Sequence, residues 1–314
     1  MKILITGVAG FIGSHLAEHL ASEGHEVVGV DNFNDYYDVS LKRLNASQVR
    51  EKGVTIIEAN LNDDLEAVLP SGFDYVYHLA AQPGIAAHIS LEEYVNNNIF
   101  ATQKLLAWTL KYNPEVKLFV NIATSSIYGL EATLPETAEV KPISFYGSTK
   151  LAAEQLVLGL ARTKQMNTCS IRCFSVYGPR ERPEKLYTKL IKAIFEGTRF
   201  PLHQGSEKHS RSFTYVGDIV KGLAAVIGKE TICNGEIFNI GSDQEFTTGE
   251  GIALIEKIIG KKAMIQHTAP RPGDQLRTTA IIDKARKLLN YDPTTEFEEG
   301  LKQQVAWYRA NFVK

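Results

Sequence analysis

The chain opens with MKILITGVAGFIGSHLAEHLASEGHEVVGVD (residues 1–31), and this stretch decides the fold. A short β-branched run, Lys2–Thr6, leads into a glycine-rich turn, and the turn opens a helix-like stretch at Phe11–Ser22. A second apolar run, Glu26–Asp31, follows. Strand, glycine-rich turn, helix and strand in this order form a βαβ unit, whose helix N-terminus supplies amide donors and a favourable dipole to a pyrophosphate.

The turn itself, GVAGFIG, carries Gly7, Gly10 and Gly13. Glycine lets the backbone turn tightly and approach a dinucleotide closely, although glycine-rich turns alone are common. The second predicted strand ends at Asp31, eighteen residues after Gly13. A carboxylate in that place can accept both ribose hydroxyls of NAD and repels the 2′-phosphate of NADP. The pattern therefore predicts an NAD site.

The alternation of strands and helices continues to about residue 175. Further β-branched runs and longer amphipathic stretches follow one another, which implies a parallel sheet covered on both faces, with ligands at the carboxyl ends of its strands. We predict an α/β fold built on a Rossmann-type doubly wound parallel sheet. The remaining strands are expected at Thr55–Ala59, Tyr75–Leu79, Leu118–Ala123 and Ser170–Phe174, and the remaining helices at Leu91–Tyr112 and Tyr146–Thr163.

After about residue 175 the pattern changes. Pro, Gly and Arg become frequent, as in YGPRERP and APRPGD, and the predicted elements are shorter and more scattered. We predict a dinucleotide-binding domain at residues 1–174 and a smaller C-terminal α/β substrate lobe that takes up most of residues 175–314. Glu236–Gly241 is expected to return to the main sheet, so the first domain regains residues at about 232–246.

Composition restricts the function classes. A chain of 314 residues favours two lobes, and 44% hydrophobic with 22% charged residues is ordinary for a globular protein. The formal net charge of −2 gives no reason to expect nucleic acid or an anionic membrane surface. No apolar run is long enough to cross a bilayer, and the first residues do not form a signal peptide. Three cysteines without metal-ligand spacing indicate buried thiols, so we expect a cytoplasmic enzyme without a metal site.

Tyr146 and Lys150, in YGSTK, form the candidate chemical centre. They lie four residues apart at the start of a predicted helix, so both side chains project from one face. A lysine ammonium and a nicotinamide cation beside a tyrosine favour its phenolate, which can then act as a base near neutral pH. Such pairs are common on helix surfaces, and the pair alone does not establish a site.

Hydroxyl groups at the end of the fifth predicted strand strengthen this interpretation. ATSSIYG places Thr124, Ser125 and Ser126 at the ligand edge of the sheet, where a hydroxyl can bind the reacting oxygen and relay its proton. Strands often end in turns rich in Ser and Thr, so this motif too has a purely structural explanation. Three motifs in the order that one reaction needs make coincidence improbable.

Taken together, the motifs resemble the extended short-chain dehydrogenases that act on nucleotide-activated sugars. The resemblance covers nearly the whole chain and rests on GVAGFIG, Asp31, HLAA, TSSIYG, YGSTK, SIRCFSVYGPRERP and RSFTYVGDI.

This resemblance implies roles for individual residues. Tyr146 would be the base, Lys150 would hold the nicotinamide ribose, and Thr124 would assist at the sugar. Arg211 and the Arg271/Asp274 pair would hold the nucleotide diphosphate and ribose of a UDP-sugar, since the arginine fork suits phosphate. NAD would contact Tyr146, Lys150 and a wider set of residues: Gly7, Gly10, Phe11, Ile12, Gly13, Asp31, Asn32, Asn60, Leu61, Leu79, Ala80, Ala81, Gln82 and Asn98.

The shared first step of this family moves a hydride from C4 of the sugar to NAD. Dehydratases of the family carry an Asp–Glu pair where this chain has Ser125 and Ser126, and related decarboxylases carry a Glu at the second position. Without these carboxylates, the simplest outcome is rotation of the 4-keto sugar and return of the hydride to its other face. The resemblance therefore implies 4-epimerisation with NAD regenerated in each turnover.

The substrate is expected to be UDP-glucuronate, which would give UDP-galacturonate. NFNDYYDVSLKR (Asn32–Arg43) resembles the corresponding segment of UDP-glucuronate 4-epimerases. Hydroxyls of Thr124, Ser125, Ser126 and Ser175, with Arg182 nearby, could hold a sugar carboxylate by charge-assisted bonds. A UDP-glucose or UDP-N-acetylglucosamine 4-epimerase and a UDP-uronate decarboxylase stay open, as does a non-catalytic dinucleotide-binding regulator. Neutral UDP-sugars remain alternative substrates because the chain departs from the uronate pattern at several positions: Asn60, Ala86, Glu184, Lys185, Leu186, Ser212 and His203–Ser206.

The same resemblance implies a homodimer, in which the helices at Leu91–Tyr112 and Tyr146–Thr163 pair with those of a second copy as a four-helix bundle. Packing inside one chain explains some of the apolar residues on these helices equally well. The residues concerned are Leu105, Leu106, Trp108, Leu151, Leu156 and Leu160.

Overall fold

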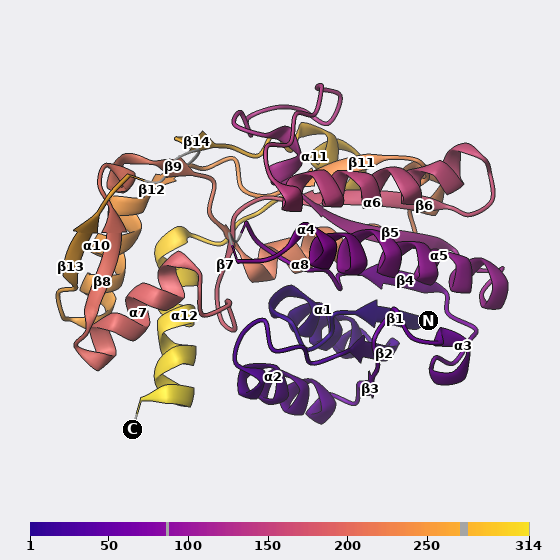
Figure 1. Ribbon diagram of the computed structural model, residues 1–314, viewed down its shortest axis with the longest axis horizontal. Coiled ribbons are helices and arrows are strands. Elements are labelled where there is room, and N and C mark those ends of the chain that lie inside the picture. The colour runs from indigo at the N-terminus through magenta and orange to yellow at the C-terminus, as the bar shows by residue number, and fades with distance from the viewer. Residues whose placement is uncertain (86–87, 271–275, 314) are drawn as a thin grey trace.

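Seven parallel strands form the main sheet of the computed structural model, which describes residues 1–85, 88–270 and 276–313. The strand order is β11-β6-β5-β4-β1-β2-β3, so the chain starts in the middle and winds outward in both directions (Figure 1). The predicted α/β fold is confirmed. The strands are β1 (Lys2–Thr6), β2 (Glu26–Asp31), β3 (Thr55–Glu58), β4 (Tyr75–His78), β5 (Leu118–Thr124), β6 (Thr168–Cys173) and β11 (Ile237–Ile240).

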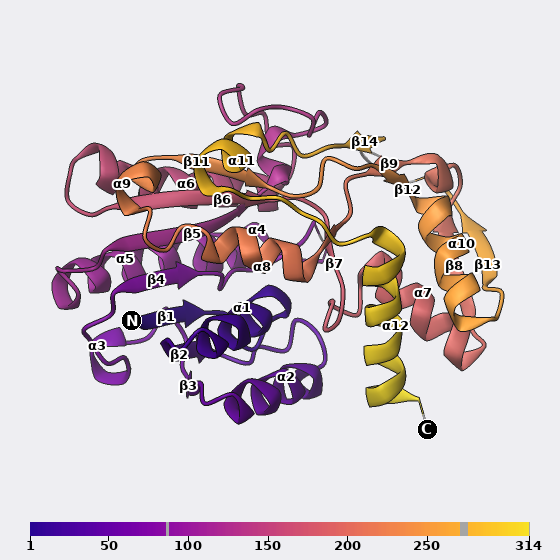
Figure 2. The same cartoon turned by 180° about the vertical axis from the view of Figure 1, so that it is seen from behind.

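Helices cover both faces of this sheet, and the alternation of side chains along each strand supplies both apolar layers. In β1, Ile3 and Ile5 belong to one layer and Leu4 to the other. One face carries α1 (Phe11–Ser22), α2 (Val39–Glu51), α8 (Val216–Ala224) and α11 (Asp283–Leu289), as Figure 2 shows for α8 and α11. The other face carries α3 (Leu65–Val68), α5 (Ala101–Tyr112) and α6 (Phe145–Arg162).

Predicted and observed elements agree to within two residues at most ends. The predicted helix Leu91–Tyr112 differs in its interior, because it consists of α4 (Leu91–Tyr94), a π-helical turn η1 (Val95–Phe100) and α5. A π-turn takes up one extra residue and is common at functional sites. Here it lies where Asn98 turns its side chain inward to bond Gln82, a tertiary contact that local periodicity cannot report.

The chain after residue 175 builds a further apolar cluster around Tyr187, Leu190 and Ile255, which is separate from the two layers on the main sheet. In Figure 1 its elements stand beside the carboxyl ends of the main strands. They include α7 (Leu186–Glu196), η3 (Ser206–Lys208), α10 (Thr248–Ile259), α12 (Phe297–Phe312), the parallel pair β8 (Arg199–His203) and β13 (Met264–Thr268), the three-stranded sheet β9 (Ser210–Arg211), β12 (Phe246–Thr247) and β14 (Arg277–Thr278), and the pair β7 (Val176–Tyr177) and β10 (Thr214–Tyr215).

This later part of the chain also contributes to the first sheet. β11 pairs with β6 from Ile237 to Ile240, within the segment expected to return. α8 packs on α1 and α11 packs on β11, so the chain passes between the two lobes several times. The short helix α9 (Glu230–Cys233) precedes β11. The division at residue 174 stays a prediction.

The cysteines and the helices give two further findings. Cys169, Cys173 and Cys233 are buried free thiols. None of the helices in the described part of the chain is long and apolar enough to span a membrane.

The contact between Gly13 and the turn after the first strand predicts a large effect of a single methyl group. A Cβ at Gly13 would lie 2.2 Å from the carbonyl oxygen of Gly7, whereas a Cβ at Gly159, inside α6, would meet nothing within 4 Å. We expect Gly13→Ala to destabilise the protein by about 1–3 kcal/mol through forced backbone shifts. Gly159→Ala, the matched control, should stabilise it by about 0.5–1 kcal/mol. Urea denaturation of both variants checks this, and equal stabilities would contradict it.

Candidate active site

Thr124 and Tyr146 meet at the carboxyl end of β5. Thr124 ends the strand, and the 3₁₀ turn η2 (Ser125–Tyr128) follows it. The Thr124 hydroxyl accepts the amide of Ser126 at 3.2 Å and lies 3.3 Å from the Ser126 hydroxyl. The Tyr146 phenol is hydrogen-bonded to the Thr124 side chain. The structure thus brings together three residues that the sequence placed in one reaction centre.

The glycine of YGSTK makes this meeting possible. A Cβ at Gly147 would lie 2.7 Å from the carbonyl oxygen of Ser126, so the first turn of α6 packs directly on the backbone of η2. Ser144 caps the helix by accepting the amide of Gly147 at 3.1 Å. The cap and the glycine together place Tyr146 at the strand end.

Lys150 lies one turn further along α6 and is 3% exposed. Burial lowers its pKa to about 8, an effect that the nearby Cys173 and Glu154 partly oppose. At the end of β4, burial and the charge of Lys150 lower the pKa of His78 to about 3. His78 is therefore neutral, held by Thr6 at 2.8 Å and Thr102 at 2.9 Å.

The charge of Arg182 acts on Tyr146. Burial raises the pKa of the Tyr146 phenol above 10.0, while the positive charge of Arg182 and the Thr124 hydrogen bond oppose that rise. Arg182 lies between β7 and α7, forms an ion pair with Glu184 at 3.0 Å and faces the ring of Tyr36 at 5.8 Å. The sequence motifs linked Arg182 to the sugar only; its effect on the pKa of Tyr146 depends on folding and has no sequence signal.

Ser125 and Ser175 stand at neighbouring strand ends. Ser125 follows β5, Ser175 follows β6, and β5 pairs with β6 along its length. Both serines are half-buried, and the Ser175 carbonyl accepts the amide of Thr214 at 2.8 Å. The predicted hydroxyl cluster therefore shares one edge of the sheet with Thr124.

The turn after β1 forms a cradle for a dinucleotide. Gly7 has a φ of 72°, and a Cβ there would lie 2.9 Å from the amide nitrogen of Ala80. Gly10 is the N-cap of α1 and has no side chain to occupy the amides of the first helical turn, where Phe11 and Ile12 are half-buried. These free donors suit an anion such as a pyrophosphate.

Asp31 closes the cradle at the end of β2. Its Oδ2 accepts the amide of Ala9 at 3.0 Å and its Oδ1 accepts the amide of Phe33 at 2.9 Å. Burial raises the pKa of this carboxyl, and the two backbone hydrogen bonds oppose that rise. Each oxygen keeps a further lone pair for a ribose hydroxyl. The next residue, Asn32, is exposed.

Gln82 and Asn98 line the opposite wall. Asn98 is buried, accepts the amide of Gln82 at 2.7 Å and donates to the Thr149 hydroxyl at 2.9 Å, so it ties the end of β4 to α6. The side-chain amide of Gln82 is buried without a hydrogen-bond partner for either polar atom. A buried amide in this state calls for a partner, and a polar ligand would satisfy it. The half-buried residues Leu79, Ala80 and Ala81 precede it. The residues present thus fit NAD.

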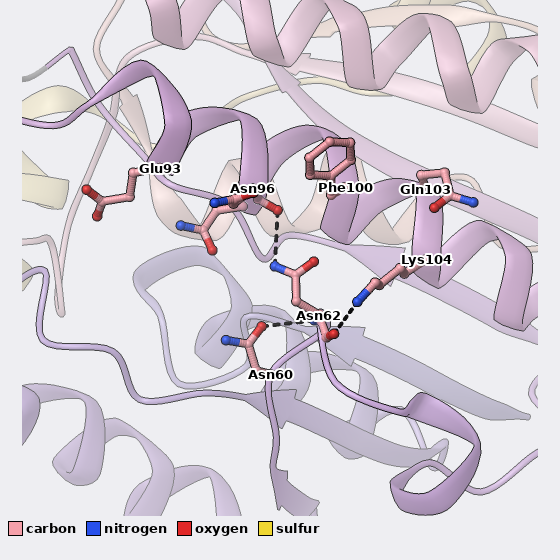
Figure 3. A pocket seen from close by; sticks show the side chains of 8 residues that line it. Asn60, Asn62, Glu93, Asn96, Phe100, Gln103 and Lys104 are labelled. Carbon is pink, nitrogen blue, oxygen red and sulfur yellow. Dashed lines mark hydrogen bonds between the residues drawn. The ribbon is translucent and has the colours of Figure 1, made fainter.

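Asn60 lies at the edge of a polar pocket of about 520 Å³ between the loop after β3 and the helix that holds Asn98 (Figure 3). Its side-chain oxygen accepts the amide of Asn62 at 2.9 Å, and Lys104 donates to the Asn62 carbonyl. The neighbouring Leu61 is 5% exposed and packs into the core. Of the residues that line this pocket, Asn60 is the one that sequence analysis assigned to the cofactor.

On the second lobe, Arg211 lies on β9 and is half-buried. Lys185 interacts electrostatically with Arg182 and Arg211, and also with the carboxylates of Glu181 and Glu184. In the sequence Lys185 stands out only as a departure from the uronate pattern, and the fold reveals its neighbours. The predicted Arg271 and Asp274, and the departure at Ala86, lie outside the described residues.

No group of three or more His, Cys, Asp or Glu residues that could hold a metal ion occurs in residues 1–85, 88–270 and 276–313.

Fold and site together define a dinucleotide-dependent enzyme of the short-chain dehydrogenase type. The family model for the NAD dependent epimerase/dehydratase family matches residues 3–241. The chain belongs to this family.

Individual relatives agree with this assignment. A Bacillus subtilis protein, "Uncharacterized UDP-glucose epimerase YtcB", is 38% identical over 98% of both chains. UDP-glucuronate 4-epimerase 4 of Arabidopsis thaliana is 35% identical over 98% of this chain and 75% of its own length. The crystal structure of UDP-glucuronic acid 4-epimerase from Bacillus cereus with UDP-glucuronic acid and NAD superposes with a TM-score of 0.91, at 33% identity, over 99% of this chain and 100% of that one.

Glu245 anchors the strand that carries Arg211. It accepts the Ser210 hydroxyl at 2.8 Å and the Thr279 hydroxyl at 2.5 Å, and it forms an ion pair with Arg277 at 2.6 Å. These bonds, with that to Arg277 the strongest, lower the pKa of Glu245 to about 2.

A depressed carboxylate pKa predicts a pH-dependent contribution to stability. Glu245 stabilises the fold at pH values above its ordinary pKa of 4.5, and this contribution is lost as the pH falls toward about 2. Glu245→Gln should therefore unfold at lower urea concentration than the parent at pH 7, and the difference should shrink at pH 3.5. A difference that stays constant between these pH values would contradict the assignment.

Proposed function

We propose that this protein catalyses NAD-dependent 4-epimerisation of a UDP-sugar, converting UDP-glucuronate to UDP-galacturonate through a transient 4-keto intermediate. The observation that carries the proposal is the Tyr146 phenol, hydrogen-bonded to Thr124 and near the Arg182 charge, at a strand end where Ser125 and Ser126 supply hydroxyls rather than carboxylates.

The chain's own groups divide the work as follows. Tyr146 removes the proton of the C4 hydroxyl, and Thr124 and Arg182 stabilise the phenolate that does so. Lys150, protonated below about pH 8, holds the nicotinamide ribose and adds positive charge. When bound, NAD would supply the acceptor for the C4 hydride and the source of its return to the other face of the keto sugar.

We propose that NAD binds in the cradle formed by the turn after β1 and by Asp31. The glycine turn with Phe11 and Ile12 binds the pyrophosphate, Asp31 and Asn32 bind the adenosine ribose, and Asn60 with Leu61 lies at the adenine. Gln82 and Asn98, after Leu79–Ala81, complete the wall. The unpartnered Gln82 amide supports this arrangement.

The negative charge of the sugar carboxylate suggests which residues contact a uronate. A 4-keto uronate is a β-keto acid that loses carbon dioxide readily, so the site must restrain its carboxylate. Hydroxyls of Ser125, Ser126 and Ser175 with the Arg182 guanidinium supply charge-assisted bonds for this purpose. Lys185, Arg211 and Arg271, with Asp274 at the uridine ribose, bind the nucleotide end. The relatives named as UDP-glucuronate 4-epimerases support this choice of substrate.

A second candidate is 4-epimerisation of a neutral UDP-hexose. The ion pair of Arg182 with Glu184 at 3.0 Å favours it, because Glu184 neutralises part of the charge that a uronate would need. The Bacillus subtilis relative, named as a UDP-glucose epimerase, points the same way.

Assembly and location complete the proposal. We infer a homodimer built on the helices predicted at Leu91–Tyr112 and Tyr146–Thr163; the α5 and α6 parts of these lie side by side in Figures 1 and 2. Leu105, Leu106 and Trp108 are at most 6% exposed and belong to the core, so they are unavailable for that bundle. Exposed apolar residues support the interface instead: Leu91, Phe100, Phe145 and Leu156. Three buried free thiols support a cytoplasmic location.

The separate apolar cluster of the second lobe supports the assignment of the two ligands to different parts of the chain. We propose that residues 1–174, with the return at 232–246, bind NAD, and that residues 175–314 mainly bind the nucleotide sugar.

The reaction is tested by incubating the purified protein with UDP-glucuronate, with and without added NAD. The products are then separated and their molecular masses are measured by mass spectrometry. An isomer of unchanged mass identified as UDP-galacturonate is the expected result. A product lighter by carbon dioxide would make the enzyme a decarboxylase. Turnover of UDP-glucose with none of UDP-glucuronate would select the second candidate.

The base is tested by Tyr146→Phe. Loss of the phenol hydroxyl should lower kcat by at least about 100-fold, because general base catalysis contributes that much or more. NAD should remain bound, since the ring and Lys150 are unchanged; the absorbance and fluorescence of the purified variant report this. Substantial remaining turnover would remove Tyr146 from the base role.

Arg182 should affect two steps separately. Arg182→Ala should shift the acid limb of the kcat profile to higher pH with both UDP-glucuronate and UDP-glucose, because the phenolate loses a stabilising charge. It should also raise KM for the uronate by about tenfold more than KM for the hexose. Ser175→Ala should show the second effect without the first. Equal losses on both sugars would contradict the carboxylate contact.

The dimer is tested with a matched pair of variants. Leu156, on α6, and Ile265, on β13, are both 39% exposed. Leu156→Asp should shift the mass measured by light scattering toward that of one chain, whereas Ile265→Asp should leave it unchanged. The same mass for both variants would place the interface elsewhere.

A further inference from the structure

A layer of polar side chains lies between α6 and the sheet. Parallel sheets covered by helices normally carry apolar residues on both faces. β6 departs from this, because its residues alternate between an apolar face, with Cys169, Ile171 and Cys173, and a polar face toward α6. The polar layer is at most 2% exposed and consists of Asn121, Glu154, Ser170, Arg172 and Asn239.

The centre of this layer is a buried ion pair. Arg172, on β6, donates from Nε to Glu154 at 3.0 Å and from Nη2 at 2.6 Å, which makes the pair bidentate. Glu154, on α6, is fully buried and also accepts the Ser170 hydroxyl at 2.9 Å. Ser170 in turn accepts a hydrogen bond from Asn121 on β5 at 3.0 Å. The helix is thus bonded to β6, and Ser170 links it further to β5.

The third donor of Arg172 reaches the segment that carries the reactive hydroxyls. Its Nη1 donates to the Tyr128 hydroxyl at 2.9 Å, and Tyr128 donates to Asn239 on β11 at 2.8 Å. The guanidinium also lies 4.9 Å from the centre of the Tyr128 ring. Tyr128 is the last residue of η2, which begins at Ser125 directly after Thr124.

A contribution to folding stability does not explain why this buried network is present. Removing a guanidinium and a carboxylate from water costs free energy for each ion, and replacing a buried pair with apolar residues is often neutral or stabilising. What the network does is join α6, which carries Tyr146 and Lys150, to η2, which follows Thr124.

We propose that Glu154, Arg172 and Tyr128 are positioning residues that hold Thr124–Ser126 in register with Tyr146 and Lys150 for the sugar reaction. This inference rests on the proposed function. A misplacement of reacting groups by about 1 Å can lower a rate by a factor of roughly 100, so a fixed register of these two elements has kinetic value.

Glu154 acts on Lys150 through charge as well. The charged and titratable groups that face Lys150 are Glu154 on its own helix, Cys173 on β6 and His78 on β4. Burial lowers the pKa of Lys150 to about 8, and Glu154 opposes that effect. Without Glu154 the pKa of Lys150 should fall further, and the lysine should lose its charge at a lower pH.

The first test removes one hydroxyl from each of two buried tyrosines. Tyr128→Phe breaks the bonds to Arg172 and Asn239, whereas Tyr77→Phe, the control, breaks a single bond to the Leu223 carbonyl on the other face of the sheet. We expect Tyr128→Phe to lower kcat at least about fivefold, with KM and NAD affinity within about twofold, and Tyr77→Phe to leave kcat unchanged. Equal kcat values for Tyr128→Phe and the parent would overturn the proposal.

The second test removes the ion pair. The double variant Glu154→Leu/Arg172→Met should fold with a Tm near that of the parent, yet show a lower kcat and a basic limb of the kcat profile moved to lower pH. Glu154→Asp, which keeps the charge, should restore the position of that limb. A folded double variant with the parent kcat and pH profile would refute the network's role. If the double variant does not fold, Tyr128→Phe decides.

Failure of the proposed function is recognised separately. If the parent enzyme turns over neither UDP-glucuronate nor a neutral UDP-hexose, the proposed reaction is wrong. The pKa of Lys150, measured by nuclear magnetic resonance on lysine-labelled protein without substrate, then tests the network alone. A pKa that is the same in Glu154→Gln as in the parent would overturn the charge effect.

Discussion

The register of α6 on the main sheet is the constraint on which the candidate site depends. Its first turn packs on the Ser126 carbonyl, where Gly147 leaves room for the close approach. Thr149 accepts the Asn98 amide, which ties the helix to the end of β4, and near its other end the Val157 carbonyl accepts the Thr168 hydroxyl of β6 at 3.0 Å. Fixed at these points, the helix can present Tyr146 to the sheet edge in only one way.

Burial sets the charge state of the groups that this register brings together. The same loss of hydration raises the pKa of Tyr146 and lowers that of Lys150, so each neutral form is favoured by the fold. Positive charge from Arg182 opposes this effect at the phenol. A base that works near neutral pH therefore needs neighbours from the second lobe as well as from its own helix, which explains why the two lobes belong to one site.

Much of the architecture could be read from local patterns. The β1–α1–β2 unit was predicted with its observed bounds, because strand and helix periodicities are strong there and Gly7 to Gly13 mark the turn unambiguously. The π-turn at Val95–Phe100 could not be predicted, since it follows from Asn98 bonding Gln82. The alternation of polar and apolar residues in TCSIRC was a visible signal for the buried layer under α6, but its meaning requires Glu154 on a distant helix.

By itself, the sequence determined the family, the parallel sheet and the identity of the tyrosine, lysine and hydroxyl residues at its edge. Each of these depends on motifs whose own residues lie within a few positions of one another. Only the tertiary structure decided which charges surround them. Arg182 acts on Tyr146 through its charge, Lys185 interacts electrostatically with two arginines, and Leu105 lies in the core. Such relations join residues far apart in the chain, and electrostatic effects depend on distance and burial in space, which no local pattern encodes.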